Sequence, residues 1–460
     1  MTRLGAAWLA ITFTTGCTLA NGIDVCRRTG APERDLNSRT EGNQRFSSRN
    51  AVGAMPSGGA LAVWTSASTD GMTSEVRGAL VAPDGALLPT CEADGEYTYS
   101  RSSEFADEAI FAPPRTTNDF GVVAYRTRSA SGHTLRVVPV TPSGCPVPPG
   151  LEPNAVELRR TKNGAQVLNP SVTSLGASTY VIMWTEMSPT VPRAHLFAQR
   201  FRLSGVGHAL ELLPTPLGPL GEVAEAVERN GNHANGTLIP LVDGAALAFF
   251  VVDSPRFQVR LVRFDTELVP RFNALVAEVT IPTGLVPDGV SIAVAHDSDT
   301  FLVGWMAGDE NAKPVLEARF LDAKGNYLTA PRAPSGETFR LGSVGSSEGE
   351  IALLGTGEGG FLAAWQEVGS LMHQDQSGRG LRALAFDSNG EVRFANRACA
   401  ATDFPLNLAQ VEDQTQPVLA RLADGTLLSA WVTNGGDTAD RSGTGLRVVG
   451  LSQFDLLPLR

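Results

Sequence analysis

The stretch "FLVGWMAGDENAKPVLEARFLDAKGN", residues 301–326, predicts two antiparallel strands with the loop and turn that follow them. An apolar run ends at Trp305, a polar loop follows, and a second apolar run closes on Asp322 and Gly325. Five of the chain's six tryptophans end such a first run, which indicates a repeat rather than a single hairpin. The seven copies end at Trp64, Tyr125, Trp184, Phe250, Trp305, Trp365 and Trp431, at intervals of 55 to 66 residues.

The second half of each copy repeats as well. "LRALAFDSNG" (381–390) aligns without gaps on "VRGALVAPDG" (76–85) and "LRVVPVTPSG" (135–144), and its final glycine suits the positive φ of a tight β-turn. Further strands precede and follow this pair, so each copy holds four strands. Four short antiparallel strands cannot bury both faces alone, and about 60 residues per copy is typical of a propeller blade. The sequence therefore predicts an all-β fold: a seven-bladed β-propeller of four-stranded antiparallel blades.

The last blade lacks a strand of its own. The chain ends soon after the third strand of the seventh copy, so the fourth strand must come from the N-terminus. We expect "GNQRFSS" (42–48) to close blade seven, which would remove the free edges of the ring. The propeller is expected to span residues 41–460.

The repeat resembles a broad group of secreted bacterial seven-bladed propellers over roughly residues 40–457. This resemblance implies the fold and leaves the activity open, because propellers host hydrolases, lyases and binding scaffolds alike. The segment "STDGMTSEV" (68–76) begins like a sialidase repeat but lacks its aromatic residue, and "DSNG" and "DAKG" carry too few carboxylates for a calcium loop.

The N-terminus resembles a bacterial lipoprotein signal: Arg3, an apolar run, Gly16 and then Cys17. The resemblance implies a signal peptide at 1–16, an acylated Cys17, a tether at 17–40 and an outer-membrane lipoprotein on its periplasmic or cell-surface side. Thr18 stands where an Asp would indicate retention in the inner membrane. An ordinary secretory signal cleaved nearby is the alternative.

Charge and composition limit the partners. The net charge of −11 argues against nucleic acid or an anionic membrane as the main partner, since both favour a basic surface. After the signal, no segment reaches the ~18 apolar residues of a membrane helix, so membrane attachment is expected only through the lipid anchor. The six histidines are scattered without metal-ligand spacing, and we expect neither a metal nor a cofactor.

Four cysteines remain once Cys17 is set aside. Cys91, Cys145 and Cys399 fall between strands three and four of blades one, two and six, and Cys26 takes the same place in blade seven if the N-terminal strand closes it. An exported chain meets oxidising conditions, and disulfides join only residues within about 7 Å of each other. We expect Cys91–Cys145 and Cys26–Cys399. A Cys26–Cys91 bond is geometrically possible, but it would leave Cys145 and Cys399 too far apart to pair. Four free thiols are a further alternative.

Two sets of residues are candidates for a ligand-binding face. In five copies the second residue of the aligned ten-residue segment (the decamer, such as 76–85) is an arginine, which could bind an anion. Repetition of this arginine from blade to blade favours a structural role. Two long polar loops break the symmetry at 366–380 and 432–445, where function would concentrate. The candidates are Arg77, Arg136, Arg260, Arg382, Arg447, His373, Asp375, Asp437, Asp440 and Arg441.

No catalytic motif is recognisable in the sequence. We therefore expect a monomeric, non-enzymatic scaffold that binds a protein or polysaccharide of the cell envelope. The alternative is a glycan-active hydrolase or lyase with its site on the central propeller face.

Overall fold

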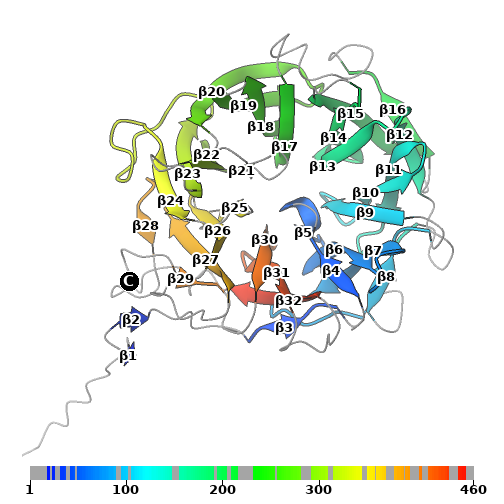
Figure 1. The fold of residues 1–460 in the computed structure, drawn as a ribbon, viewed down its shortest axis with the longest axis horizontal. Coiled ribbons are helices and arrows are strands. Elements are labelled where there is room, and N and C mark those ends of the chain that lie inside the picture. The colour runs from blue at the N-terminus through cyan, green and yellow to red at the C-terminus, as the bar shows by residue number, and fades with distance from the viewer. Residues whose placement is uncertain are drawn as a thin grey trace, which may run out of the picture.

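Copies two to six of the repeat each form one antiparallel sheet, while copies one and seven are joined in a nine-stranded sheet, and all stand around a central channel in the computed structural model (Figure 1). The structure describes residues 18–20, 23–25, 32–37, 42–46, 49–89, 95–101, 105–147, 155–190, 194–204, 209–215, 232–253, 256–280, 292–308, 314–343, 350–357, 359–368, 378–387, 389–393, 404–406, 413–434 and 444–451. The seven copies are the seven predicted blades, two of which share a sheet. The all-β seven-bladed propeller is confirmed.

The blades follow one another along the chain, and each has its first strand nearest the channel (Figure 1). Blade 1 contains β4 (Asn43–Arg45), η1 (Arg49–Ala51), β5 (Val52–Ala54), β6 (Ala60–Ala67), β7 (Ser74–Val81) and β8 (Glu96–Thr98). Blade 2 contains β9 (Phe105–Ala112), β10 (Gly121–Ser129), β11 (Gly132–Val140) and β12 (Val156–Arg160). Blade 3 contains β13 (Gln166–Gly176), β14 (Thr179–Met187), β15 (Ala194–Ser204) and β16 (Ala209–Leu213). Blade 4 contains β17 (Asn232–Leu241), β18 (Gly244–Asp253), β19 (Arg256–Asp265) and β20 (Pro270–Thr280).

The remaining blades complete the ring. Blade 5 contains β21 (Ile292–Asp297), β22 (Thr300–Gly308), β23 (Pro314–Asp322) and β24 (Phe339–Ser343). Blade 6 contains β25 (Ile351–Gly355), β26 (Phe361–Val368), β27 (Arg379–Phe386), β28 (Val392–Arg393) and β29 (Phe404–Pro405). Blade 7 contains β30 (Gln414–Arg421), β31 (Leu427–Asn434), β32 (Thr444–Leu451) and β3 (Arg34–Asp35). A small hairpin of β1 (Thr18–Ala20) and β2 (Ile23–Val25) lies outside the ring.

The strand register confirms the repeat and corrects the position of its aromatic residue in blade 4. In six blades the aromatic residue of the second strand lies directly opposite the second residue of the decamer, as Trp64 lies opposite Arg77. In blade 4 the residue opposite Arg260 is Phe249, whereas the sequence comparison assigned Phe250. Both phenylalanines are apolar and buried, so composition alone did not distinguish the two registers.

The N-terminal chain closes blade 7 through two short strands, one of which lies in the expected segment. Strand β3 pairs antiparallel with β32, with Asp35 opposite Arg447, and the Leu36 amide donates to the Leu446 carbonyl at 2.9 Å. Strand β4, within the expected segment 42–48, pairs parallel with β32 through Asn43 and Thr444 and antiparallel with β6, so it links the last blade to the first. The propeller was expected to begin at residue 41, but β3, at Arg34–Asp35, already belongs to blade 7.

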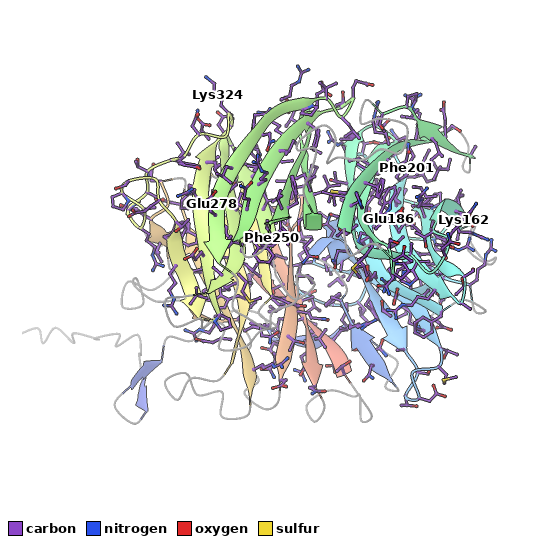
Figure 2. All side chains as sticks on the ribbon, turned by 45° about the horizontal axis from the view of Figure 1, so that its top comes forward. Lys162, Glu186, Phe201, Phe250, Glu278 and Lys324 are labelled. Atoms are coloured by element: carbon purple, nitrogen blue, oxygen red, sulfur yellow. The ribbon has the colours of Figure 1, made fainter. Side chains whose placement is uncertain are left out.

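The repeated tryptophans are buried and pack between blades. Four of them have no exposed surface and Trp184 is 3% exposed. Trp365 of blade 6 lies against Gly342 of β24 in blade 5, where even a Cβ atom would come within 2.7 Å of its indole nitrogen. Figure 2 shows how densely side chains such as Phe201 and Phe250 fill the space between the sheets.

The two ends of the ring differ in which loops they carry. We call the end where the innermost strands begin, and where strands two and three are joined, the upper face. The lower face is the end where the innermost strands finish and strands one and two are joined. Within the described residues, no helix is long and apolar enough to cross a membrane.

Candidate functional site

The five repeated arginines lie on the third strand of their blades, away from the channel (Figure 1). Arg77 binds Glu96 at 2.8 Å, with both side chains buried, and Arg382 lies 3.7 Å from Glu367. Arg447 lies 3.5 Å from both Glu33 and Asp35 on the closing segment. These three arginines therefore bind carboxylates of their own blade.

The other two arginines of the set have different surroundings. Arg260 donates to Gln258 at 3.1 Å and to Asn273 at 3.2 Å, and Arg136 is partly buried on β11 opposite Tyr125. The structure does not bring the five arginines together at one point. His373, Asp375, Asp437, Asp440 and Arg441 lie outside the described residues, as do Cys17, Cys26, Cys91 and Cys399.

Cys145 is the one predicted cysteine that the described ranges include, and it is disulfide-bonded. Its sulfur lies 3.7 Å from the hydroxyl of Tyr97, in the buried connection that follows β11. The expected partner, Cys91, falls in a segment outside these ranges, so the pairing itself stays a prediction.

A feature that the sequence comparison did not single out is a polar bulge in the innermost strands. At this bulge two residues oppose the aromatic of the second strand, and the first has a left-handed φ between 49° and 54°. Residues other than glycine seldom adopt this backbone conformation, which costs free energy and is often found at functional sites. The four residues are Glu108, Asn169, Asn235 and Gln416.

The bulges bring polar groups of neighbouring blades together. The Asn169 amide donates to the Asn235 side-chain oxygen, and Asn169 also contributes a backbone hydrogen bond to Glu108. Oε1 of Gln416 and Oε2 of Glu108 are buried without a hydrogen-bond partner among the described residues. A sequence signal was present, because a polar residue followed by Pro or Gly (169–170, 235–236, 416–417) interrupts a strand ladder.

Glu108 belongs to a charged cluster close to the upper end of blade 2. Nε and Nη2 of Arg126 donate to the two oxygens of Asp107 at 2.7 and 2.9 Å, while Nη1 lies 2.8 Å from Glu108 Oε1. Arg128 also binds Asp107, and Arg45 lies 3.9 Å away from it. One guanidinium thus holds both carboxyl groups, although they are consecutive in the chain, because the left-handed bulge turns Glu108 out of the alternation of the strand.

The two carboxyl groups have different environments. Asp107 has no exposed surface and binds guanidinium groups through both oxygens. The Glu108 side chain is 16% exposed, and burial raises its pKa to about 7, more than the nearby charge of Arg126 lowers it. At pH 7 Glu108 is therefore protonated in about half of the molecules, beside Asp107, which is bound to arginines.

His133 borders this cluster and is neutral. Burial, together with the charge of Arg126, lowers its pKa. Nδ1 of His133 lies 3.1 Å from the amide nitrogen and 3.3 Å from the carbonyl oxygen of Val167 on β13. His133 in this way ties blade 2 to blade 3.

The lower half of the channel contains a separate cavity of about 500 Å³. The ends of the seven innermost strands line it, mostly with apolar groups such as Val294, Leu354 and Leu419. The amide of Asn50, on η1, donates to Ser171, to the Val172 carbonyl and to the Leu238 carbonyl at 3.0 to 3.2 Å. A segment of blade 1 therefore reaches blades 3 and 4 across the channel at the inner end of this cavity.

Comparison with known proteins finds no matching family model and no curated relative. Solved structures with a similar arrangement include the GH93 alpha-L-arabinofuranosidase of Fusarium graminearum, at 10% identity and a TM-score of 0.39, covering 77% of this chain and 99% of that one. A subtype N11 neuraminidase-like protein from a flat-faced bat isolate of Peru has 11% identity and a TM-score of 0.38, covering 94% and 97%. The GH43 endo-arabinanase of Bacillus licheniformis has 13% identity and a TM-score of 0.29, covering 62% and 93%.

These structural neighbours are mostly glycoside hydrolases by name, so the expectation of a non-enzymatic scaffold is corrected. The expectation that the chain is more likely not an enzyme is corrected with it. At these identities the likeness concerns the propeller fold alone. Among the described residues, no group of three or more His, Cys, Asp and Glu side chains is arranged to hold a metal.

Proposed function

We propose that the chain is a glycan-active hydrolase and that Glu108 is its proton donor. The observation that supports this most directly is Oε2 of Glu108, a buried carboxyl oxygen without a partner among the described residues, on a side chain that still has exposed surface. A carboxylic acid whose pKa is about 7 keeps its proton in a large share of molecules at neutral pH. It can protonate the leaving oxygen of a glycosidic bond, which is the step that most glycosidases assign to one of two carboxyl groups.

The surrounding residues are suited to this role. Arg126 binds Oε1 of Glu108 and leaves Oε2 to carry the proton. Asp107 neutralises Arg126 from its other edges, so the arginine does not drive Glu108 fully into its ionised form. Asp107 is a positioning residue here, because it is fully buried and bound to arginines.

The propeller gives such a donor an accessible position. The bulge residues of neighbouring blades lie at the same level of the channel, and the partly exposed Asn169, held by Asn235, carries an amide of the kind that can bind sugar hydroxyls. A glycan approaching the upper face would meet these groups from several blades at once.

The test is release of reducing ends from a panel of arabinans, sialylated glycans and bacterial envelope polysaccharides, comparing the parent with Glu108→Gln. We expect the parent to cleave at least one polymer, and the variant to lose at least a hundredfold in rate, since general acid catalysis contributes about 10²–10⁴-fold. An aryl glycoside with a dinitrophenolate leaving group needs no proton, so the variant should cleave it much closer to the parent rate.

Glu211→Gln serves as the matched control, because Glu211 is exposed on the outermost strand of blade 3. Cleavage of none of the glycans by the parent, or parent-like cleavage of a polymer by Glu108→Gln, would count against the proposal. The rate should also fall as the pH rises through about 7, where the donor loses its proton.

We further propose, from the N-terminal sequence, that the hydrolase is an outer-membrane lipoprotein acting on glycans of the envelope or its surroundings. The support is the resemblance of the segment before Cys17 to a lipoprotein signal. Cys17→Ser should release the protein from the membrane fraction, and sedimentation of that variant with the outer membrane would contradict the anchor.

A further inference from the structure

The cavity in the lower half of the channel has the size and lining of a small-molecule site. Its volume of about 500 Å³ lies within the 300–1,000 Å³ usual for such sites, and most of its wall is apolar. The walls come from rigid innermost strands of all seven blades, so the cavity exists without rearrangement of loops. The Glu108 cluster contributes no residue to it.

The charged residues that line this cavity are of one sign, although Asp297 and Asp119 lie close to His296 and Arg115 just outside the lining. Its described lining includes two arginines, Arg115 and Arg421, and one histidine, His296, but no aspartate or glutamate. This is unusual for a chain with a net charge of −11. Burial lowers the pKa of His296, so the two guanidinium groups carry the charge near pH 7.

Arg115 is fixed in place. Its Nε donates to Ser174 Oγ at 3.1 Å, and its Nη2 donates to the carbonyls of Ser174 and Leu241 at 2.9 and 3.0 Å. These bonds join blade 2 to blades 3 and 4 and involve no carboxylate. The guanidinium therefore keeps its full charge and, through Nη1, spare donor capacity at the cavity.

Arg421 lies at the end of β30 and is exposed, and no ion pair joins it to a residue in the described part of the chain. Its guanidinium packs against Gly357 of blade 6, which fixes its position at the cavity. A planar guanidinium in this state is suited to two parallel hydrogen bonds with a carboxylate.

We propose that this lower cavity binds an amphiphile made of a single hydrocarbon chain and a terminal carboxylate. The apolar walls would take up the chain, at roughly 0.8 kcal/mol for each buried methylene. The carboxylate would lie at the mouth against Arg421, with Arg115 adding a second positive charge. Such a site is independent of the glycan-active role proposed for the upper face.

The experiment is a calorimetric titration of the full chain with dodecanoate below its micelle concentration. The controls are dodecyltrimethylammonium, which has the same chain and the opposite charge, and butanoate, which has the headgroup without the chain. We expect one dodecanoate per protein, with binding weakened by salt, and at least tenfold weaker binding of both controls.

Two variants and one matched control locate the site. Arg421→Gln should weaken dodecanoate binding about tenfold, because it removes a charge-assisted hydrogen-bonding pair. Ala54→Phe should reduce binding by occupying the cavity that Ala54 lines. Arg202→Gln, at an exposed arginine on β15, should bind dodecanoate like the parent. Unchanged melting temperatures would show that each variant is folded.

Several results would overturn this proposal. Equal binding of dodecanoate and dodecyltrimethylammonium would show that charge plays no part, and parent-like affinity in Arg421→Gln would exclude that headgroup contact. Equal weakening by Arg202→Gln would point to a nonspecific charge effect. Glu108→Gln should bind dodecanoate as the parent does, so failure of the glycan hydrolase proposal would leave this result unaffected.

Discussion

Replacement of Glu108 by Gln should change how the stability of the protein depends on pH. Burial raises the pKa of Glu108 in the folded chain from 4.5 to about 7, so between these values the folded state holds a proton that the unfolded chain has lost. For such a group the stabilising contribution is complete below pH 4.5 and is lost as the pH rises to 7. A difference of about 2.5 pH units corresponds to about 3 kcal/mol in the free energy of unfolding.

Glutamine has nearly the shape of a protonated glutamate but does not ionise. The variant therefore lacks this loss of stability. Relative to the parent, Glu108→Gln should gain about 3 kcal/mol between pH 4 and pH 8, with most of the change between pH 5 and pH 7. Above pH 7.5 the difference should level off, because Glu108 of the parent is then ionised in both states.

Urea unfolding followed by tryptophan fluorescence measures this difference. Five buried tryptophans report on the blades, and unfolding midpoints at five pH values give the free-energy difference between variant and parent. Glu211→Gln, at an exposed site on β16, should show a difference that is almost independent of pH. If the Glu108→Gln difference is as flat as that of the control, the carboxyl group is not held in its neutral form, and the proton-donor role fails with it.

Three further outcomes follow from the packing of the ring. Trp305→Ala should lower the free energy of unfolding by about 3–5 kcal/mol, because the indole is fully buried between blades; a loss below 1 kcal/mol in urea unfolding would contradict this. Gly342→Ala should lower the melting temperature, since its Cβ would lie 2.7 Å from Trp365, whereas Gly176→Ala should not, as nothing lies within 4 Å; equal melting of both would refute the blade contact. Deletion of residues up to 37 should expose the edge of β32 and cause aggregation or early melting, and a deletion that melts like the parent would show that β3 is dispensable.

The repeat could be predicted from the sequence because it follows from local chemistry. A strand with an aromatic end, a turn glycine such as Gly325 and a second apolar run recur seven times, and each feature acts within a few residues of itself. The burial of the tryptophans follows from the same pattern, because a large apolar residue at one position of every blade must pack against the next blade. The number of blades and the all-β class needed no tertiary information.

The closure of the ring by the N-terminal chain could be predicted from the sequence only in part. The missing fourth strand of blade 7 is a matter of counting, but the sequence did not show that two segments meet β32, 34–35 antiparallel and 42–48 parallel, with the second also pairing with β6. Both segments are short and polar, so neither has a pattern that excludes the other. The one-residue error at Phe249 and Phe250 has a similar cause, since both neighbours are apolar.

The candidate site was decided by the tertiary structure. Asp107 and Glu108 are consecutive and should point to opposite faces of a strand, yet a left-handed bulge brings both onto Arg126. The raised pKa of Glu108 depends on burial, which no local pattern records. The sequence by itself determined which strands form and how often they recur, because those depend on near neighbours. Only the closed ring decided which polar groups meet in the channel, because those residues are dozens of positions apart and converge when seven blades share one axis.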